Sequence, residues 1–455
     1  MGRWGKCIVI SAVLVIAGSV LVPVVLLVRF AGKSGLVRDE IARIKTEGCP
    51  ASAADLEGNP LPDNENAALL YEKALKYLDT EAARQDQSLL RRLSDPHERA
   101  QDPQSWSRLR TVASRYSKAL ELARQAAAMP KCRFPTEPSR SHDYMGRQYG
   151  FVRSLPRLAW AQALVDAKDG RADRALQSVE LIFAMGESIN ADRTPSGTMS
   201  RYRAIGTATD ALVDVAQFGG IDESQARRLS DLLARIDLRD CATRAMEGER
   251  AMGITVFDQM RKGGIRSGYS DADSDSPIDK MHGLLPTGWV LNNDEVRYLR
   301  DIRKQIKVAG SSYRAIKPHK AVRYDPPRYA LYASWTSSMG VRAVLARDQA
   351  IARLGGDRIF LGLVAYRSHF GSYPATLDGL RSKLNWRVPL DPFSGKAFVY
   401  HRQGRGFILY SIGGDLKDNS GTPWGYGSQG GSMWRRGGVV QNPDDVGDYV
   451  WKRRL

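Results

Sequence analysis

One uncharged stretch near the N-terminus constrains this chain more than any other feature of its sequence. Residues 7–28 (CIVISAVLVIAGSVLVPVVLLV) contain no charged side chain. As a helix with a rise of about 1.5 Å per residue, the stretch would be roughly 33 Å long, enough to cross a hydrocarbon core of about 30 Å. A cleavable signal peptide is the alternative, because Arg3 and Lys6 precede the stretch. We expect an uncleaved transmembrane anchor, since the stretch is longer than a usual signal-peptide core and no Ala-x-Ala site follows it.

The charges that flank the predicted anchor leave two orientations open. Two basic residues precede it, and five follow it: Arg29, Lys33, Arg38, Arg43 and Lys45. Counting these charges by the positive-inside rule would place the C-terminal side in the cytoplasm. Large domains, however, translocate largely regardless of flanking charge. We therefore expect a single-pass protein of the cell membrane with the bulk of the chain outside the cytoplasm.

The remaining composition is that of a globular protein with a basic surface. The chain of 455 residues has 67 Lys and Arg against 50 Asp and Glu, a net charge of +17. Its mean hydropathy of −0.37 excludes a polytopic membrane protein. The basic residues are spread along the whole chain and match no nucleic-acid-binding module, so we expect no specific nucleic-acid partner. A general attraction to anionic lipid or wall polymer accounts for them better.

The four cysteines exclude a disulfide-dense scaffold. Cys7 lies in the predicted anchor, which leaves Cys49, Cys132 and Cys241 for the rest of the chain. An odd number leaves at least one thiol free or linked to another molecule. A Cys49–Cys132 disulfide and the absence of any disulfide are both compatible with the sequence.

Apolar residues at helical spacing dominate the chain up to about residue 370. Residues 158–183 predict two helices around a short turn at Gly170, which we interpret as an ordinary antiparallel pair because no repeat at a fixed period follows. Further helices are predicted to begin at Asp63 or Asn64 and to cover residues 106–129, 229–236 and 247–260. Another is predicted over 335–370, with a kink or break at Gly355-Gly356.

After Gly371 the pattern changes to short β-rich runs. Residues 398–400 and 407–410 flank the turn residues 403–406, which predicts a hairpin, and the chain beyond Gly413 looks like a loop. The fold class is therefore mainly α. We expect an N-terminal basic segment and transmembrane helix over residues 1–34, a large helical ectodomain over 35–334, and a long helix with a small α+β module over 335–455.

The common catalytic motifs are missing from the sequence. It has no Cys-x-x-Cys, His-Glu-x-x-His, Gly-x-Ser-x-Gly or Walker A segment, which argues against the commonest zinc, hydrolase and nucleotide-dependent enzymes. Residues 425–430 match Gly-x-Gly-x-x-Gly, but no helix is predicted after them, and we interpret them as a loop. Residues 271–277 resemble the start of an EF-hand loop, yet the twelfth position is His282 instead of Glu, which favours a solvated acidic loop.

Residues 357–421 contain an ordered series of motifs. A helix leads into Tyr373-Pro374-x-x-Leu377, then Asp391-Pro392-Phe393-Ser394-Gly395, then Leu409-Tyr410-Ser411-Ile412-Gly413-Gly414-Asp415. This series resembles the C-terminal part of the major pseudopilin of type II secretion. It resembles even more closely the tails of bacterial proteins that have an N-terminal anchor and a helical ectodomain. The N-terminus departs from the pseudopilins, because residues 5–11 contain neither the Phe of the cleavage site nor the Glu that follows it.

The resemblance implies a role and a metal site. It implies a non-enzymatic envelope protein whose C-terminal module acts in protein interaction or in envelope or secretion assembly, with a protein partner in the envelope. In pseudopilins the loop after the hairpin binds calcium, and Asp415 and Asp418 match the positions of its ligands. Carboxylate oxygens are ligands that calcium prefers.

An enzyme is the competing interpretation. An envelope hydrolase could assemble a dispersed acid/base site in the helical domain, for which Glu247 and Glu249 are candidates. Residues at i and i+2 of a helix point to different faces, which weakens this pair. A polar pocket with two carboxylates about 5–10 Å apart would favour the hydrolase, and an exposed apolar patch would favour binding.

Overall fold

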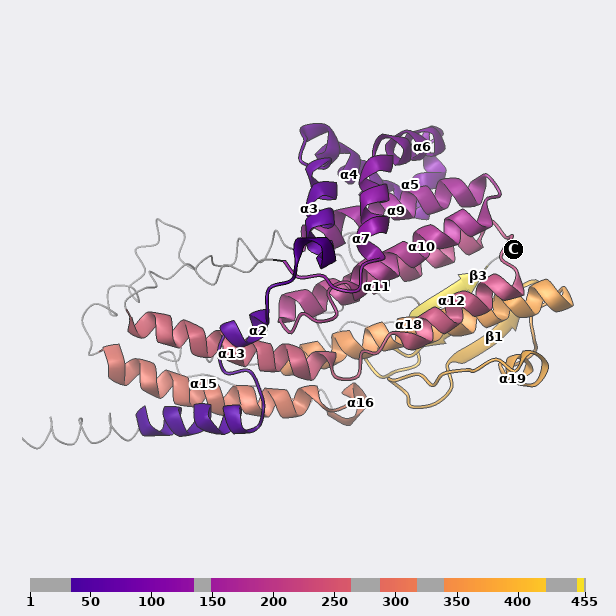
Figure 1. Cartoon of the computed structure of the whole chain (residues 1–455). Helices are drawn as coiled ribbons and strands as arrows, with labels where there is room; N and C mark the ends of the chain where they lie inside the picture. The colour runs from indigo at the N-terminus through magenta and orange to yellow at the C-terminus, as the bar shows by residue number, and fades with distance from the viewer. Residues whose placement is uncertain (1–33, 135–148, 263–286, 317–338, 423–447, 454–455) are drawn as a thin grey trace, which may run out of the picture. The chain divides into compact units, whose positions relative to one another are not determined.

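The computed structural model describes residues 34–134, 149–262, 287–316, 339–422 and 448–453. These residues form a mainly helical protein with one small antiparallel sheet, which confirms the predicted fold class at that level (Figure 1). None of the helices within these ranges is long and apolar enough to span a bilayer. The predicted anchor over residues 7–28 lies outside them, as do the predicted loops over 271–277 and 425–430 and the boundary near residue 334.

The chain divides into two compact units, and each is made of segments that are distant in sequence. The first unit takes residues from Met1–Leu56, Glu247–Gln305 and Arg323–Ser338. Its described elements are a helix over residues 34–46, α2 (Ala54–Glu57), most of α13 (Cys241–Arg261) and most of α15 (Thr287–Ala309).

An aromatic contact and hydrogen bonds from α15 hold the first unit together. Tyr298 of α15 stacks near Phe257 of α13 with ring centroids 5.7 Å apart, and its hydroxyl donates to the carbonyl oxygen of Glu249 at 2.8 Å. Arg303 of α15 donates to Glu40 at 2.6 Å and to Glu47 at 3.0 Å, which joins α15 to residues 34–46. The basic segment over residues 34–46 is therefore helical, with Val37 and Ile44 buried.

The second unit contains the remaining helices and the sheet. Its N-terminal helices are η1 (Asp63–Glu65), α3 (Ala67–Lys76), α4 (Glu81–Leu93), α5 (Pro96–Gln101), α6 (Ser105–Arg115) and α7 (Ser117–Ala127). The helices that follow are α9 (Gly150–Lys168), α10 (Ala172–Glu187), α11 (Pro195–Ala216), α12 (Glu223–Arg235), α16 (Tyr313–Ile316), α18 (Met339–Phe370) and α19 (Asp378–Leu384).

Several predicted helices are confirmed, and their ends move for identifiable reasons. The antiparallel pair predicted over 158–183 is α9 and α10. The helix expected from Asp63 starts later, because Asn66 caps α3 by accepting from the amide of Ala68 at 3.2 Å. The single helix predicted over 106–129 is wrong, since Tyr116 leaves the helical conformation and separates α6 from α7.

A kink or break was predicted at Gly355-Gly356, and the structure has no break there. Helix α18 runs without interruption from Met339 to Phe370. A β-carbon at Gly355 would lie 3.2 Å from the Phe398 ring, and one at Gly356 would overlap the ring of Trp451. The glycines therefore let bulky side chains approach the helix backbone closely, instead of ending the helix.

The sheet has one more strand than the sequence predicted. Strands β1 (Val399–Gln403) and β2 (Gly406–Ser411) form the expected hairpin around a two-residue loop. Strand β3 (Tyr449–Arg453) then pairs antiparallel with β2, with Trp451 opposite Leu409, so the strand order is β1-β2-β3. The expectation that everything beyond Gly413 is loop is therefore wrong, because a strand far along the chain completes the sheet.

Helix α18 is buried on two sides. It packs against α11 and α12 and also against β2 and β3, and the three strands lie along it in Figure 1. Its side chains are buried almost continuously from Val344 to Ala365. One of them is Asp357, which accepts hydrogen bonds from Trp451 Nε1 at 2.8 Å and from Thr209 Oγ1 at 2.9 Å. This carboxyl thus links the last strand, the long helix and α11.

We predict that Gly356→Ala lowers the melting temperature of the full-length chain. The added methyl group would overlap the Trp451 ring, and overpacking of this kind costs about 1–3 kcal/mol. Gly150→Ala is the matched control, because its nearest neighbour, Leu75 Cδ1, would lie at an ordinary 3.6 Å. Equal melting temperatures for the two variants in calorimetry would contradict this role for Gly356.

A second prediction follows from Asp357. Burial raises the pKa of its carboxyl from 3.8 to about 7, although hydrogen bonds from Trp451 and Thr209 act to lower it. The folded state then holds the proton more tightly than the unfolded state, so this group makes the free energy of unfolding fall as pH rises from about 4 to about 7.

Asp357→Asn should remove that dependence, because the amide can accept from Trp451 and donate to Thr209 without carrying a charge. The measurement is the denaturation midpoint of wild type and variant at several pH values between 4 and 8. A variant that keeps the wild-type slope would show that Asp357 does not titrate in this range.

Candidate metal centre

The loop after β2 contains the two sequence-predicted site residues and is tightly turned. Gly413, Leu416, Ser420 and Gly421 all have positive φ, from 56° to 74°. The start of the loop is fastened to the turn before β1, because Ser411 Oγ donates to Asp391 Oδ1 at 2.7 Å. These features fix the backbone on which Asp415 and Asp418 sit.

The carboxylates of Asp415 and Asp418 both accept hydrogen bonds from groups of the loop, and Asp418 also accepts one from β2. The Asn419 amide nitrogen donates to Asp415 Oδ2 at 2.8 Å, and the backbone amide of Lys417 donates to its other oxygen at 3.1 Å. Asp418 Oδ1 accepts from the Tyr410 hydroxyl at 3.0 Å and from the amide of Ser420 at 2.8 Å. The structure thus brings the two predicted residues into one loop.

A third carboxylate, which sequence reasoning missed, joins them. Asp448 is 1% exposed, and its two oxygens accept from the amides of Asn419 at 3.3 Å and Gly421 at 2.8 Å. Burial is the main reason why its pKa is raised to about 6; the hydrogen bonds from the amides of Gly421 and Asn419 act to lower it, and the charges of Asp418 and Asp415 act to raise it. The sequence analysis missed Asp448 because this residue lies immediately before β3, a strand that was not predicted.

The three carboxylates therefore share one electrostatic environment, which a cation would stabilise. The type of donor suits calcium, which takes six to eight oxygens from carboxylates, carbonyls and water. Across the ranges that the structure describes, no group of three or more His, Cys, Asp or Glu side chains is arranged to hold a metal ion. Backbone and amide N–H groups occupy carboxylate oxygens here, so the loop would have to rearrange to surround an ion.

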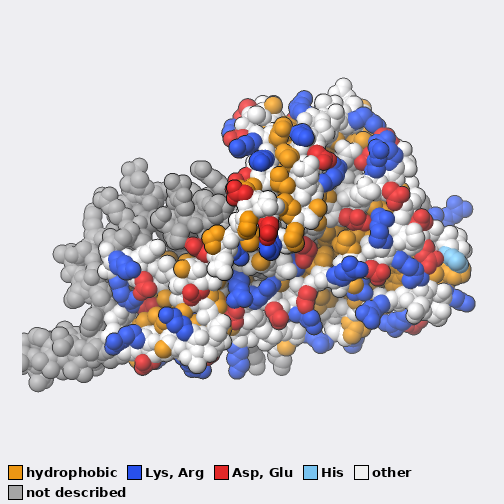
Figure 2. All heavy atoms as spheres, viewed as in Figure 1, with side chains coloured by type: hydrophobic (Ala, Val, Ile, Leu, Met, Phe, Trp, Pro, Cys, Tyr) orange, Lys and Arg blue, Asp and Glu red, His pale blue; other side chains and the backbone are white. Residues whose placement is uncertain are grey.

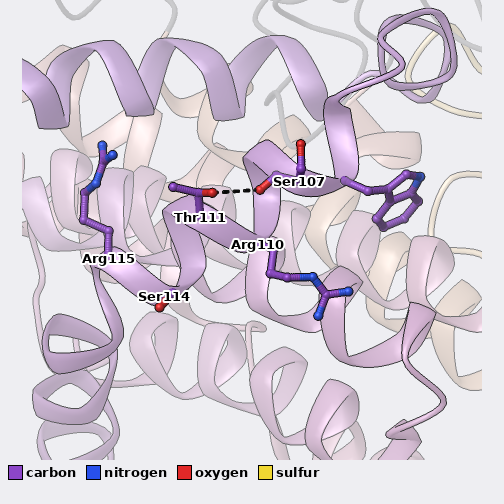
Figure 3. A pocket seen from close by; sticks show the side chains of 6 residues that line it. Ser107, Arg110, Thr111, Ser114 and Arg115 are labelled. Atoms are coloured by element: carbon purple, nitrogen blue, oxygen red, sulfur yellow. Dashed lines mark hydrogen bonds between the residues drawn. The ribbon is translucent and has the colours of Figure 1, made fainter.

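A second feature of this unit is an open cavity on α6. It has a volume of about 670 Å³ and is lined by Trp106, Ser107, Arg110, Thr111, Ser114 and Arg115. Figure 3 shows Arg110 and Arg115 extending toward opposite ends of this surface, with the hydroxyl of Thr111 bonded to the Ser107 carbonyl at 3.0 Å between them. Both arginines are already paired, Arg110 with Asp169 at 2.7 Å and Arg115 with Asp86 at 2.6 Å.

The candidate hydrolase residues lie in the other unit. The Cys49 thiol contacts Glu247 Oε1 at 3.8 Å. Burial raises the pKa of the Glu249 carboxyl to about 7. Cys49, Cys132 and Cys241 are free thiols in the structure, and burial raises the pKa of Cys132 to about 12.

The surface carries charges of both signs. On the face drawn in Figure 2, Lys and Arg side chains are dispersed among Asp and Glu side chains instead of forming one block. Large apolar side chains that are exposed among the described residues are few and distant in sequence, and they are Leu36, Tyr77, Phe218, Phe370 and Leu390.

Comparisons with known proteins add nothing to this geometry. No protein-family model, no curated protein and no solved structure matches the chain. The functional argument therefore depends on the residues themselves.

Proposed function

We propose that this chain is a single-pass, membrane-anchored, non-enzymatic protein of a bacterial envelope. Its C-terminal module would mediate protein interaction or the assembly of envelope or secretion machinery, with a protein partner in the envelope. Residues 7–28 would anchor the chain in the cell membrane, and the bulk of the chain would lie outside the cytoplasm.

One observation carries this proposal: the motif residues that resemble a pseudopilin tail contact one another. Asp391, buried in the turn before β1, accepts from Ser411 at the end of β2 and from the amides of Phe393 and Ser394. The Tyr400 hydroxyl donates to the carbonyl of Pro374, where the chain leaves α18, at 2.7 Å. These contacts between the helix, the turn and the hairpin support the proposal that the motifs act together.

Calcium is part of the same proposal. Asp415, Asp418 and Asp448 would contribute carboxylate oxygens, and Asn419 lies beside them with an amide oxygen of its own. The bound ion would neutralise the repulsion that raises the pKa of Asp448 and would fix the loop between β2 and β3.

We expect calcium at millimolar concentration to raise the melting temperature of the full-length chain. A ligand that binds only the folded state stabilises it by mass action, and weak extracellular sites with dissociation constants of about 10⁻⁴–10⁻³ M begin to fill in that range. Asp415→Ala should abolish the rise while leaving the calcium-free melting temperature unchanged or slightly higher.

The control is Asp378→Ala, which removes a carboxylate that is 81% exposed on α19 in the same module. This variant should respond to calcium like the wild type. The metal assignment is wrong if calcium leaves the wild-type melting temperature unchanged, or if the Asp378 variant loses the response as well.

The predicted topology has its own test. A reporter enzyme that is active only after export, fused behind Leu455, should be active in cells, whereas a reporter that requires the cytoplasm should be inactive at the same junction. The opposite pair of results would place the C-terminal side in the cytoplasm, as the basic residues after the anchor would favour.

The hydrolase alternative draws on one observation. A carboxyl with a pKa near 7, such as that of Glu249, is suited to general acid catalysis. Its nearest candidate partner, Glu247, is two residues away on the same helix and therefore points to a different face. The cavity on α6 offers arginine, hydroxyl and indole groups in its lining instead of a pair of carboxylates. We therefore rank binding above catalysis.

A further inference from the structure

Asp357 on α18 is covered by two elements that differ in how firmly they are held. Its side chain is 0% exposed, and it contacts Thr209 of α11 on one side and Trp451 of β3 on the other. Helix α11 has 22 residues and packs against α9, α10 and α18. Strand β3 has five residues and, among the described strands, pairs with β2 alone at the edge of the sheet. Of these two elements, β3 is therefore the one that can leave Asp357 at the lower cost.

The contacts of Asp357 suit a carboxyl that carries a proton. The Thr209 hydroxyl has one proton, and two oxygens lie within its reach, the Ile205 carbonyl at 3.0 Å and Asp357 Oδ2 at 2.9 Å. A protonated Asp357 can donate to Thr209, which then donates to Ile205. The other oxygen of Asp357 accepts from Trp451 Nε1 at 2.8 Å. In that form one chain of hydrogen bonds joins β3, α18 and α11, and no charge is buried.

Two charged groups act on Asp357, and they oppose each other. Arg353 lies one turn earlier on α18, and Asp210 lies on α11. The two are paired, with Arg353 Nη1 at 3.8 Å from Asp210 Oδ1. Burial is the largest cause of the raised pKa of Asp357. The charge of Arg353 acts to lower this pKa and the charge of Asp210 acts to raise it, and Trp451 of β3 brings no charge.

We propose that Asp357 and Trp451 form a proton-controlled latch, which holds β3 on α18 at acid pH and lets the strand detach more readily at neutral pH. Detachment of β3 lets water reach the carboxyl, which then ionises without the cost of a buried charge. The proton is released to solvent when the strand leaves and is taken up again when the strand returns.

The direction of the effect follows from linkage between proton binding and detachment. The carboxyl of Asp357 has a pKa of about 7 while β3 covers it, against an ordinary value of about 4 once it is hydrated. Because the covered form holds the proton more tightly, acid stabilises the docked strand, and this stabilisation is lost as pH rises from about 4 to about 7. The equilibrium constant for detachment therefore rises by up to about tenfold per pH unit in that range and levels off above it.

The latch also acts on the loop after β2. Asp448 lies immediately before β3 and accepts from the backbone amides of Asn419 and Gly421. Detachment of β3 withdraws this carboxylate from the loop and frees one edge of β2. The structure of the C-terminal module thus depends on the pH of its surroundings.

Hydrogen exchange of the detergent-solubilised full-length chain, followed by mass spectrometry, tests the latch. The measurement is made in calcium-free buffer, so that it does not depend on the proposed calcium site, and each rate is divided by the intrinsic exchange rate at the same pH. We expect the amides of β3 to exchange through an opening that is more frequent than that of α11. The opening constant of β3 should rise about 50-fold from pH 5 to pH 7 and only about twofold from pH 7 to pH 8.

Asp357→Asn should remove this pH dependence. The amide keeps a donor for Thr209 and an acceptor for Trp451, but it has no proton to release in this range. Asp210→Asn is the matched control, because it neutralises the neighbouring carboxylate in the same way, and it should keep the wild-type pH dependence. If Asp357→Asn does not fold, the pH profile of the wild type still decides the question.

The proposal is overturned if the opening constant of β3 in the wild type is equal at pH 5 and pH 7. It is also overturned if β3 opens only together with α11, because the proton would then act on the whole unit. Retention of the wild-type pH dependence by Asp357→Asn, or its loss in Asp210→Asn, would likewise overturn it, since another group would then carry the proton.

Discussion

The second unit depends on the burial of one helix on two sides. Helix α18 covers the three-stranded sheet with one face and packs on α11 and α12 with another. A helix in that position cannot carry a bulky side chain at every contact, and Gly355, Gly356 and Gly362 let Phe398, Trp451 and Trp386 approach its backbone. The buried Asp357 then ties Trp451 to Thr209. The small sheet and the helices therefore share one core.

This arrangement determines what the loop between β2 and β3 can do. Strand β3 returns to β2 from far along the chain, and Asp448 at its start lies beside Asp415 and Asp418. The pairing of β3 with β2 thus brings a third carboxylate beside the two carboxylates of the loop. The candidate calcium site therefore arises from tertiary packing.

The sequence predicted the features that depend on local pattern. Apolar residues at helical spacing predicted the pair α9 and α10, and the turn residues 403–406 between β-rich runs predicted the β1–β2 hairpin. Prediction from the sequence failed for residues whose structural role depends on a partner that is distant in sequence. Gly355-Gly356 was interpreted as a kink or break because the sequence does not show that Trp451 packs against Gly356. Asp448 was overlooked because β3 was not predicted.

Native-state hydrogen exchange of the full-length chain tests the shared core most directly. If α18 joins the sheet to the helices, the slowest amides of β2, α11, α12 and α18 should exchange with one common free energy of opening and respond together to low denaturant. A sheet that opens at a clearly lower free energy than α11 and α12 would contradict this account and would make the C-terminal module an independent domain.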